Sequence, residues 1–264
     1  MLRPWVAARG RADQWDSGPR GLAGRLLRVA YAILGTLATL AVVAFAILLV
    51  RGGPADAPLW STFQPTAEGL GTAEELAAFV ESRHVFEDGT PMVSVSADWL
   101  TLQDAPIEYV SIERPDSNGR TDELLVPVTS TVKFGLCGDG EQCSITRGAA
   151  SPERLRYLSR ASLELALHTF QYMPEVESVV AYLPPPVGTQ PTWALFFQRD
   201  DFAWALDAPL SELMALTPPS TPALMVPAEA TLIDELTTPI QFRYSFYETN
   251  LDETVLGLSS DAPG

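Results

Sequence analysis

Residues 29–50 have the sequence VAYAILGTLATLAVVAFAILLV, which contains no charged, Asn, Gln or Pro side chain over 22 residues. A helix of this length spans about 33 Å, enough to cross a hydrocarbon core about 30 Å thick. A buried helix of a soluble domain would normally have a polar stripe where one face meets water, and this segment has none. The sequence therefore predicts one transmembrane helix at residues 29–50.

The charges on either side of this segment predict its orientation. Residues 1–28 contain six arginines and two aspartates, a net charge of +4, whereas the chain beyond Gly52 contains 10 basic and 31 acidic residues, a net charge of −21. The positive-inside rule places the basic tail in the cytoplasm. Lys133 is the only lysine beside sixteen arginines, a composition typical of a GC-rich bacterial genome. We therefore expect a protein of the bacterial cytoplasmic (inner) membrane with an extracytoplasmic C-terminal domain.

A cleaved signal peptide is the alternative to a retained anchor. Ala55-Asp56-Ala57 resembles a small-residue cleavage site, and cleavage there would leave a mature chain that begins at Pro58. The apolar stretch is longer than the usual h-region of about 7–15 residues, and Arg51 lies between it and the site. Both features favour a retained anchor.

The predicted helix and the tail offer two possible contact surfaces. Small residues spaced four apart in the helix would allow another helix to approach closely, although such residues are common in membrane helices in general. These residues are Ala32, Gly35, Thr36 and Thr39. In the tail, Trp5 and Trp15 would lie at the lipid headgroups or contact a partner subunit. We expect the lipid bilayer and one or more membrane or outer-face proteins as partners, and no nucleic acid, because the distal region is acidic.

The chain beyond the helix is predicted to form one α+β domain, with helices packed on a mixed or antiparallel sheet. The domain boundaries are a tail at 1–28, a helix at 29–50, a linker at 51–64, the domain at 65–258 and a flexible end at 259–264. Helices are expected at 73–83, 152–172, 209–216 and 228–236, and strands at 92–96, 107–113, 124–134, 176–183, 193–198 and 240–247. Thr72-Ala73-Glu74-Glu75 has the pattern of a capping box, and Ser151-Pro152-Glu153 that of a helix start.

Cys137 and Cys143 are the most specific local feature of the domain. They enclose the sequence Gly-Asp-Gly-Glu-Gln, in a compartment that the predicted topology makes oxidising. We predict a disulfide that stabilises a hairpin tip by about 2 kcal/mol. A redox dithiol and a metal site are the alternatives, but a redox pair usually has Cys-x-x-Cys spacing, and zinc would need about two further ligands.

Catalytic signatures are scarce. His84 is interpreted as a cation at the end of a helix, and His168 as a partner of Glu164 four residues before it. Asp200 with Asp201, and Asp139 with Glu141, have the oxygens that Ca²⁺ or acid–base chemistry needs, but a solvated surface is the favoured interpretation of both pairs. No nucleophile, nucleotide, haem or zinc motif is present, so we expect no catalytic residue, metal or cofactor.

Two functional hypotheses from different classes follow. The first is a non-enzymatic accessory or scaffolding subunit of a bacterial membrane protein complex, anchored by one helix and docking through its extracytoplasmic domain. The second is a membrane-tethered enzyme, ligand-binding or sensor domain, for which a concave pocket near aromatic residues would be the sign. The aromatic residues considered for such a pocket are Trp99, Trp193, Trp204 and Tyr247.

Overall fold

The computed structural model describes residues 60–260 except 103–104, 116–120, 129 and 250–252. The predicted membrane helix, the basic tail and most of the predicted linker therefore lie outside the described residues. The same holds for Trp5, Trp15, Ala32, Gly35, Thr36 and Thr39. Within the described ranges, no helix is both long and apolar enough to cross a membrane.

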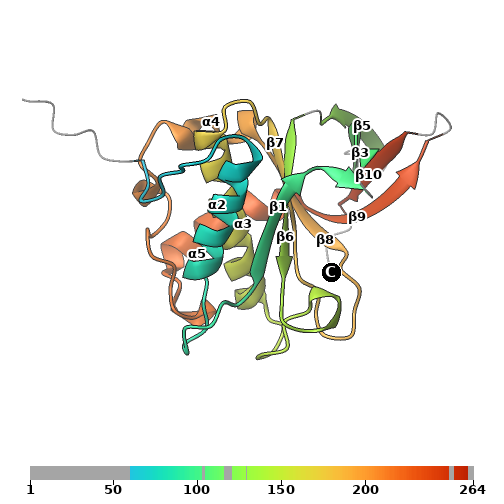
Figure 1. Ribbon diagram of the computed structural model, residues 1–264. Helices are drawn as coiled ribbons and strands as arrows, with labels where there is room; N and C mark the ends of the chain where they lie inside the picture. The colour runs from blue at the N-terminus through green and yellow to red at the C-terminus, as the bar shows by residue number, and fades with distance from the viewer. Residues whose placement is uncertain (1–59, 103–104, 116–120, 129, 250–252, 261–264) are drawn as a thin grey trace, which may run out of the picture. The chain divides into compact units, whose positions relative to one another are not determined.

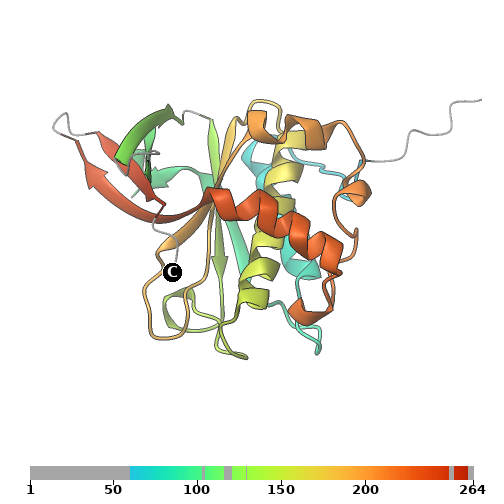
Figure 2. The same ribbon diagram turned by 180° about the vertical axis from the view of Figure 1, so that it is seen from behind.

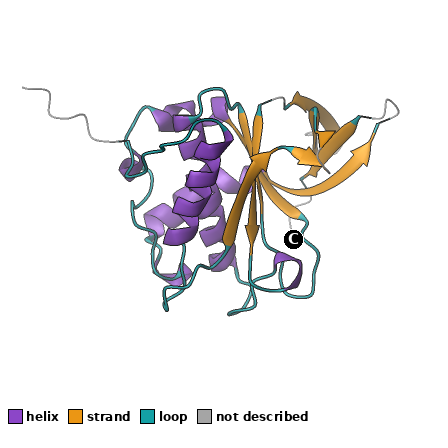
Figure 3. Ribbon diagram, viewed as in Figure 1, coloured by secondary structure: helices purple, strands orange, loops and turns teal. Residues whose placement is uncertain are grey.

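The described residues form helices on one face of a sheet of eight strands (Figures 1 and 3). The helices are α2 (Leu70–Arg83), α3 (Pro152–Tyr172), α4 (Arg199–Leu206) and α5 (Pro227–Thr237), and the short 3-10 turns are η1 (Glu141–Cys143), η2 (Leu210–Glu212), η3 (Pro222–Leu224) and η4 (Thr238–Ile240). The strands of the large sheet are β1 (Ser94–Trp99), β4 (Tyr109–Pro115), β5 (Thr121–Pro127), β6 (Thr131–Cys137), β7 (Ser178–Tyr182), β8 (Trp193–Gln198), β9 (Gln241–Glu248) and β10 (Thr254–Ser259). A small separate pair consists of β2 (Thr101–Leu102) and β3 (Ala105–Pro106).

The sheet is mixed, which confirms the predicted α+β domain. Its strand order is β1-β6-β7-β8-β9-β10-β4-β5. The pairs β6–β7 and β10–β4 are parallel, and the other neighbours are antiparallel. Parallel neighbours need a long crossover, and α3 lies in the connection from β6 to β7. Strands β1 and β5 are therefore the two edges of the sheet.

The first hydrophobic core lies between the helices and β1, β6, β7 and β8. Helix α3 is its centre, because every residue from Tyr157 to Phe170 is buried. Its neighbours are α2, α4, α5 and the sheet, which together enclose it (Figures 1 and 2). A helix that is surrounded in this way must bury its polar residues as well, and these include Arg160, Glu164 and His168.

The second hydrophobic core lies on the opposite face of β7 and β8. Strands β9, β10, β4 and β5 bend away from the helix layer (Figure 1), and the apolar side chains of β9, β10 and β4 pack against Val180 and Phe196. Because neighbouring residues of a strand face opposite sides, Phe196 belongs to this second core and Phe197 to the first. Strand β8 thus separates the two cores.

Helix α2 begins earlier than the sequence predicted, and the predicted capping box is wrong. Gly69 precedes the helix with a φ of 57°, and no side chain caps the first turn. Thr72 lies inside the helix, where its hydroxyl donates to the carbonyl of Ala67 at 2.7 Å. Glu75 instead accepts hydrogen bonds from the backbone and side chain of Thr66. Glu75 therefore holds the segment before α2 at Thr66 and does not cap the helix.

The predicted strand at 124–134 is in fact two strands. Strands β4 and β5 form a hairpin, which pairs from Tyr109 with Pro127 to Pro115 with Thr121. The N–H of Val128 still donates to the carbonyl of Glu108 at 2.9 Å, one position beyond this pairing. The chain then leaves the hairpin, and β6 pairs with β1 and β7 instead.

Three further elements differ from the expectation. The segment 209–216 forms only the turn η2, and α4 and β10 were not expected. Strand β10 pairs on both sides, with β9 and β4, and it includes Ser259. Ser259, which the prediction placed in a flexible end, therefore belongs to a strand.

Candidate functional site

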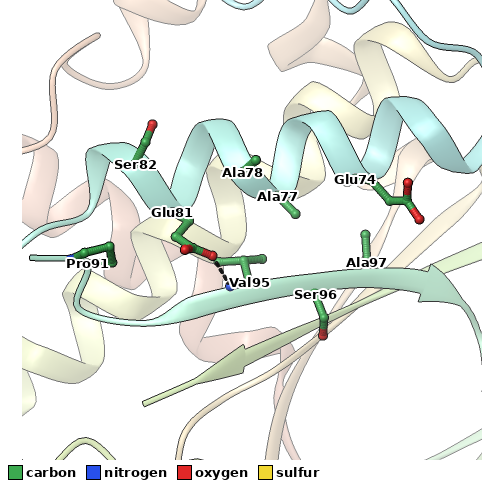
Figure 4. Close-up of a pocket in the computed structure, with 9 residues that line it drawn as sticks. All are labelled: Glu74, Ala77, Ala78, Glu81, Ser82, Pro91, Val95, Ser96 and Ala97. Carbon is green, nitrogen blue, oxygen red and sulfur yellow. Dashed lines mark hydrogen bonds between the residues drawn. The ribbon is translucent and has the colours of Figure 1, made fainter. Parts of the chain in front are cut away.

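The edge strand β1 and helix α2 form an open groove of about 460 Å³ (Figure 4). Ala77 and Ala78 of the helix and Val95 and Ala97 of the strand are among the residues that line it. These short side chains keep the two elements from filling the space between them. The groove therefore leaves open space along β1.

The backbone of β1 faces this groove along its unpaired edge. The N–H of Val95 points outward and donates to Oε2 of Glu81 at 2.9 Å (Figure 4). Because backbone groups alternate along a strand, the N–H groups of Ala97 and Trp99 point the same way. The N–H of Trp99 donates to Oδ1 of Asp98 at 2.8 Å. Ala97, between these two, is the position where a further strand would pair first.

The charge of the groove is negative. Glu74 and Glu81 line it, and the nine lining residues include no Lys, Arg or His. The apolar floor together with the two carboxylates suits a long aliphatic side chain that ends in a cation, because such a side chain buries its stem and keeps its charge near water. The groove can therefore bind an extended segment that contains Lys or Arg.

The predicted disulfide is confirmed. Cys137 and Cys143 are bonded, with their Cα atoms 4.2 Å apart. The ring closes tightly, because the N–H of Gly138 donates to the carbonyl of Cys143 at 2.8 Å. A Cβ atom on Gly138 would lie only 2.2 Å from the carbonyl oxygen of Ser144, so this position requires glycine. The bridge thus fastens a well-ordered turn at the end of β6.

The interpretation of His84 as a cation at a helix end is wrong. His84 is buried at 1% exposure, its Nδ1 donates to the carbonyl of Val80 at 3.0 Å, and its Nε2 accepts from Nη1 of Arg160 at 3.3 Å. Burial and the charge of Arg160 lower the pKa of His84 to about 3. The imidazole is therefore neutral at physiological pH, and its two nitrogens hold α2 against α3.

Arg160 is the centre of a buried ionic cluster that joins three helices. Its Nε is 2.7 Å from Oε1 of Glu229 on α5, and its Nη1 is 3.0 Å from Oε2 of Glu164 on α3. Arg83 of α2 reaches the other oxygen of Glu164 at 2.8 Å. The side chains of Arg160 and Glu164 are no more than 1% exposed. None of these four side chains lines the groove, and their contacts with one another give the cluster a structural role.

His168 does not pair with the side chain of Glu164, so that prediction is also wrong. Its Nδ1 donates to the backbone carbonyl of Glu164 at 2.8 Å, while the carboxylate of Glu164 is bound to arginines. The His168 ring packs edge-on against Trp60 and Phe63, with centroids 5.1 and 5.6 Å apart. Burial lowers the pKa of His168. This aromatic cluster fixes the point where the chain enters the domain.

Local structure explains the positions of carboxylates in the two acidic pairs. Asp200 and Asp201 occupy the first turn of α4, where carboxylates are favoured by the helix dipole. Asp139 accepts from the N–H and the hydroxyl of Thr146, at 3.0 and 2.7 Å, and these bonds lower its pKa. Among the described residues, no group of three His, Cys, Asp or Glu is arranged to hold a metal ion.

The four aromatic residues considered for a single pocket lie in different places. Trp99 lines a cleft beside β4 and β5, and Trp193 lines another near the start of α3. Trp204 and Tyr247 are exposed at 52% and 41%. No shared pocket is formed by these residues.

The groove residues were missed because an edge strand cannot be recognised from local sequence. The spacing of Glu74 and Glu81, two turns apart on one helix face, was the available signal. Comparison of the chain with known proteins found no matching family model, no matching curated protein and no matching solved structure. Any function assigned to this chain therefore depends on the geometry of its own residues.

Proposed function

We propose that this chain is a non-enzymatic accessory subunit of a bacterial membrane assembly. A helix at residues 29–50 anchors it with the basic tail in the cytoplasm, and the acidic domain lies outside the cytoplasmic membrane. The groove between α2 and β1 binds an extended, basic segment of a partner protein, which adds a ninth strand to the sheet. The open edge of β1 is the single observation that most supports this proposal.

Edge strands are usually protected by charge, bulges or covering elements, because their unpaired backbone N–H and C=O groups can pair with a strand of another chain. On β1 the protection is slight. Glu81 covers the N–H of Val95, while the backbone of Ala97 faces the groove. An incoming strand would displace the Glu81 carboxylate, which could then pair with a lysine or arginine of the partner. The edge is therefore suited to reversible pairing.

The charge of the whole domain supports the same choice of partner. The chain beyond Gly52 has a net charge of −21, and the two carboxylates of the groove add a local negative field. Such a field accelerates the approach of a positively charged segment and rejects an acidic one. The groove lining offers carboxylates, hydroxyls and apolar groups, which favours recognition over chemistry.

Strand addition is tested with Ala97→Pro in the full chain, reconstituted in nanodiscs. Proline removes the outward N–H but is tolerated on an edge strand, so the fold should persist while strand addition is lost. The probes are fluorescent peptides of alternating threonine and lysine, or alternating threonine and glutamate. We expect the basic peptide to bind to the unaltered chain, as measured by fluorescence anisotropy. The acidic peptide should bind to that chain at least about tenfold more weakly, and the basic peptide should bind to Ala97→Pro at least about tenfold more weakly.

Val187→Pro is the matched control, since Val187 is 65% exposed on a loop far along the chain from β1. It should leave binding unchanged, and circular dichroism should show that both proline variants are folded. Equal binding of the two peptides, or full binding by a folded Ala97→Pro variant, would reject the docking proposal.

The anchor is tested separately by mass spectrometry of the mature protein and by protease treatment of intact spheroplasts. We expect residues 29–50 to be retained, the protein to resist alkaline extraction, and the domain to be digested from the outside while the tail is protected. A mature chain that begins at Pro58 would contradict the proposed anchor and leave the docking groove as a separate question.

A further inference from the structure

A second cleft lies on the face of the sheet opposite the helices. It holds about 280 Å³ and is lined by residues of β1, β2, β6, β7 and β9. One wall is polar and contains Asp98, Thr101 and Lys133, and the other is aromatic. Because Ser96 and Asp98 alternate with Val95 and Ala97 along β1, this cleft and the α2 groove lie on opposite faces of the strand.

The polar wall has no net charge, and the ammonium group of Lys133 already has polar partners. Nζ of Lys133 lies 3.2 Å from Oδ2 of Asp98, 3.2 Å from the carbonyl of Thr101 and 3.1 Å from its hydroxyl. An ammonium group has three donors, and these contacts use them. Lys133 and Asp98 therefore offset each other's charge, so this wall offers no net charge to an anion or a cation.

The aromatic wall contains a hydroxyl group without a partner. Oη of Tyr182 is buried and makes no hydrogen bond to any described residue. The Tyr182 ring meets Tyr244 edge-on at a centroid distance of 4.7 Å, and Tyr244 meets Phe246 at 5.9 Å. Burial raises the pKa of both tyrosines, so both hydroxyls stay protonated at neutral pH and can donate.

A buried hydroxyl without a partner is unfavourable, and such groups commonly mark a place where a water or a ligand supplies the missing bond. The free hydrogen-bonding group and the aromatic rings lie in one cleft, while the charges beside them are paired. This combination suits a ligand that is uncharged, bears hydroxyl groups and has an apolar face to lie against rings.

We infer that this cleft binds a neutral saccharide unit, whose ring lies against Tyr244 and Phe246 while one of its hydroxyls bonds to Tyr182. The compartment proposed for the domain is one where such units are exposed on bacterial envelope polymers, but the cleft geometry does not depend on that location. This site differs from the proposed docking groove, because Tyr182, Tyr244 and Phe246 line only the cleft, although Ser96 lines both.

The test uses the full chain in nanodiscs and four small probes observed by saturation-transfer NMR. The neutral probes are glucose and N-acetylglucosamine, and the charged probes are citrate and choline. We expect at least one neutral probe to bind at millimolar concentration and neither charged probe to bind. Tyr182→Phe, which removes only the hydroxyl, should weaken that binding by about tenfold without lowering the melting temperature.

Tyr247→Phe is the matched control, because Tyr247 points to the other side of β9 and its hydroxyl is 3.5 Å from Glu123. It should leave the affinity for the sugar unchanged. Absence of binding by both sugars, equal binding by Tyr182→Phe and the unaltered chain, or binding of citrate or choline in the cleft would each overturn the inference.

Discussion

Arg160→Met is expected to lower the free energy of unfolding by about 3–5 kcal/mol, because it leaves buried carboxylates without their cation. Glu229 would lose its 2.7 Å contact and Glu164 one of its two arginines, while His84 would lose the donor to its Nε2. Chemical denaturation of the full chain in detergent, followed by circular dichroism, measures this change.

Arg156→Met is the matched control on the same helix. Arg156 forms two hydrogen bonds with Asp234 of α5, at 2.7 and 2.6 Å, but the two side chains are 29% and 45% exposed. An exposed pair of this kind contributes at most about 1 kcal/mol. If Arg156→Met lowered the free energy of unfolding as much as Arg160→Met, burial would not explain the effect.

A triple variant separates the destabilisation caused by unpaired carboxylates from that caused by lost packing. Replacing Arg160 by Met together with Glu164 and Glu229 by Leu removes all the charges that Arg160 neutralises. Much of the lost stability should then return, since well-packed apolar residues often replace a buried ionic cluster at no cost. Arg83 is 18% exposed and can turn its charge toward water.

Phe196→Ala and Phe197→Ala should each lower the free energy of unfolding by about 3–5 kcal/mol. The two variants should weaken different parts of the domain. Phe196 packs in the core beneath β4, β9 and β10, and Phe197 in the core beneath the helices. Hydrogen exchange of the full chain resolves the two cases, because regions open in cooperative units. Phe196→Ala should expose amides of β4, β5, β9 and β10, and Phe197→Ala those of α3.

The neighbouring position of the two phenylalanines makes each the control for the other. They share the same strand, the same volume and nearly the same burial, at 2% and 0% exposure. Identical exchange patterns in the two variants would show that the sheet and both cores unfold as one unit, and would contradict the assignment of separate cores.

Elements with strong local signals were predicted from the sequence. Helix α3 begins as expected, since the Ser151 side chain accepts from the N–H of Arg154 at 3.2 Å, and β8 has the predicted bounds. The disulfide was also predictable, because its two cysteines are close in sequence. These features depend on residues that are close together in the sequence, so local sequence patterns were enough to predict them.

Elements that depend on distant partners were not predicted. Gly257 weakens any strand signal in β10, yet glycine leaves room for the Tyr247 ring, which a Cβ atom there would approach to 2.9 Å. His84 was misread because its partner Arg160 is 76 residues away. The two candidate sites were missed for the same reason, because both depend on the position of β1 at the edge of the sheet. The membrane helix and its orientation remain predictions.

The place of β10 in the sheet determines when the domain can be completed. This strand follows all other described strands in the chain, yet it lies between β9 and β4, and Val255 pairs with Tyr109. The β4–β5 hairpin is made early during synthesis but has no strand that pairs it with the rest of the described sheet until β10 is made. Final folding therefore waits until the last of the described strands has been made, and chaperones would meet the hairpin before the finished domain exists.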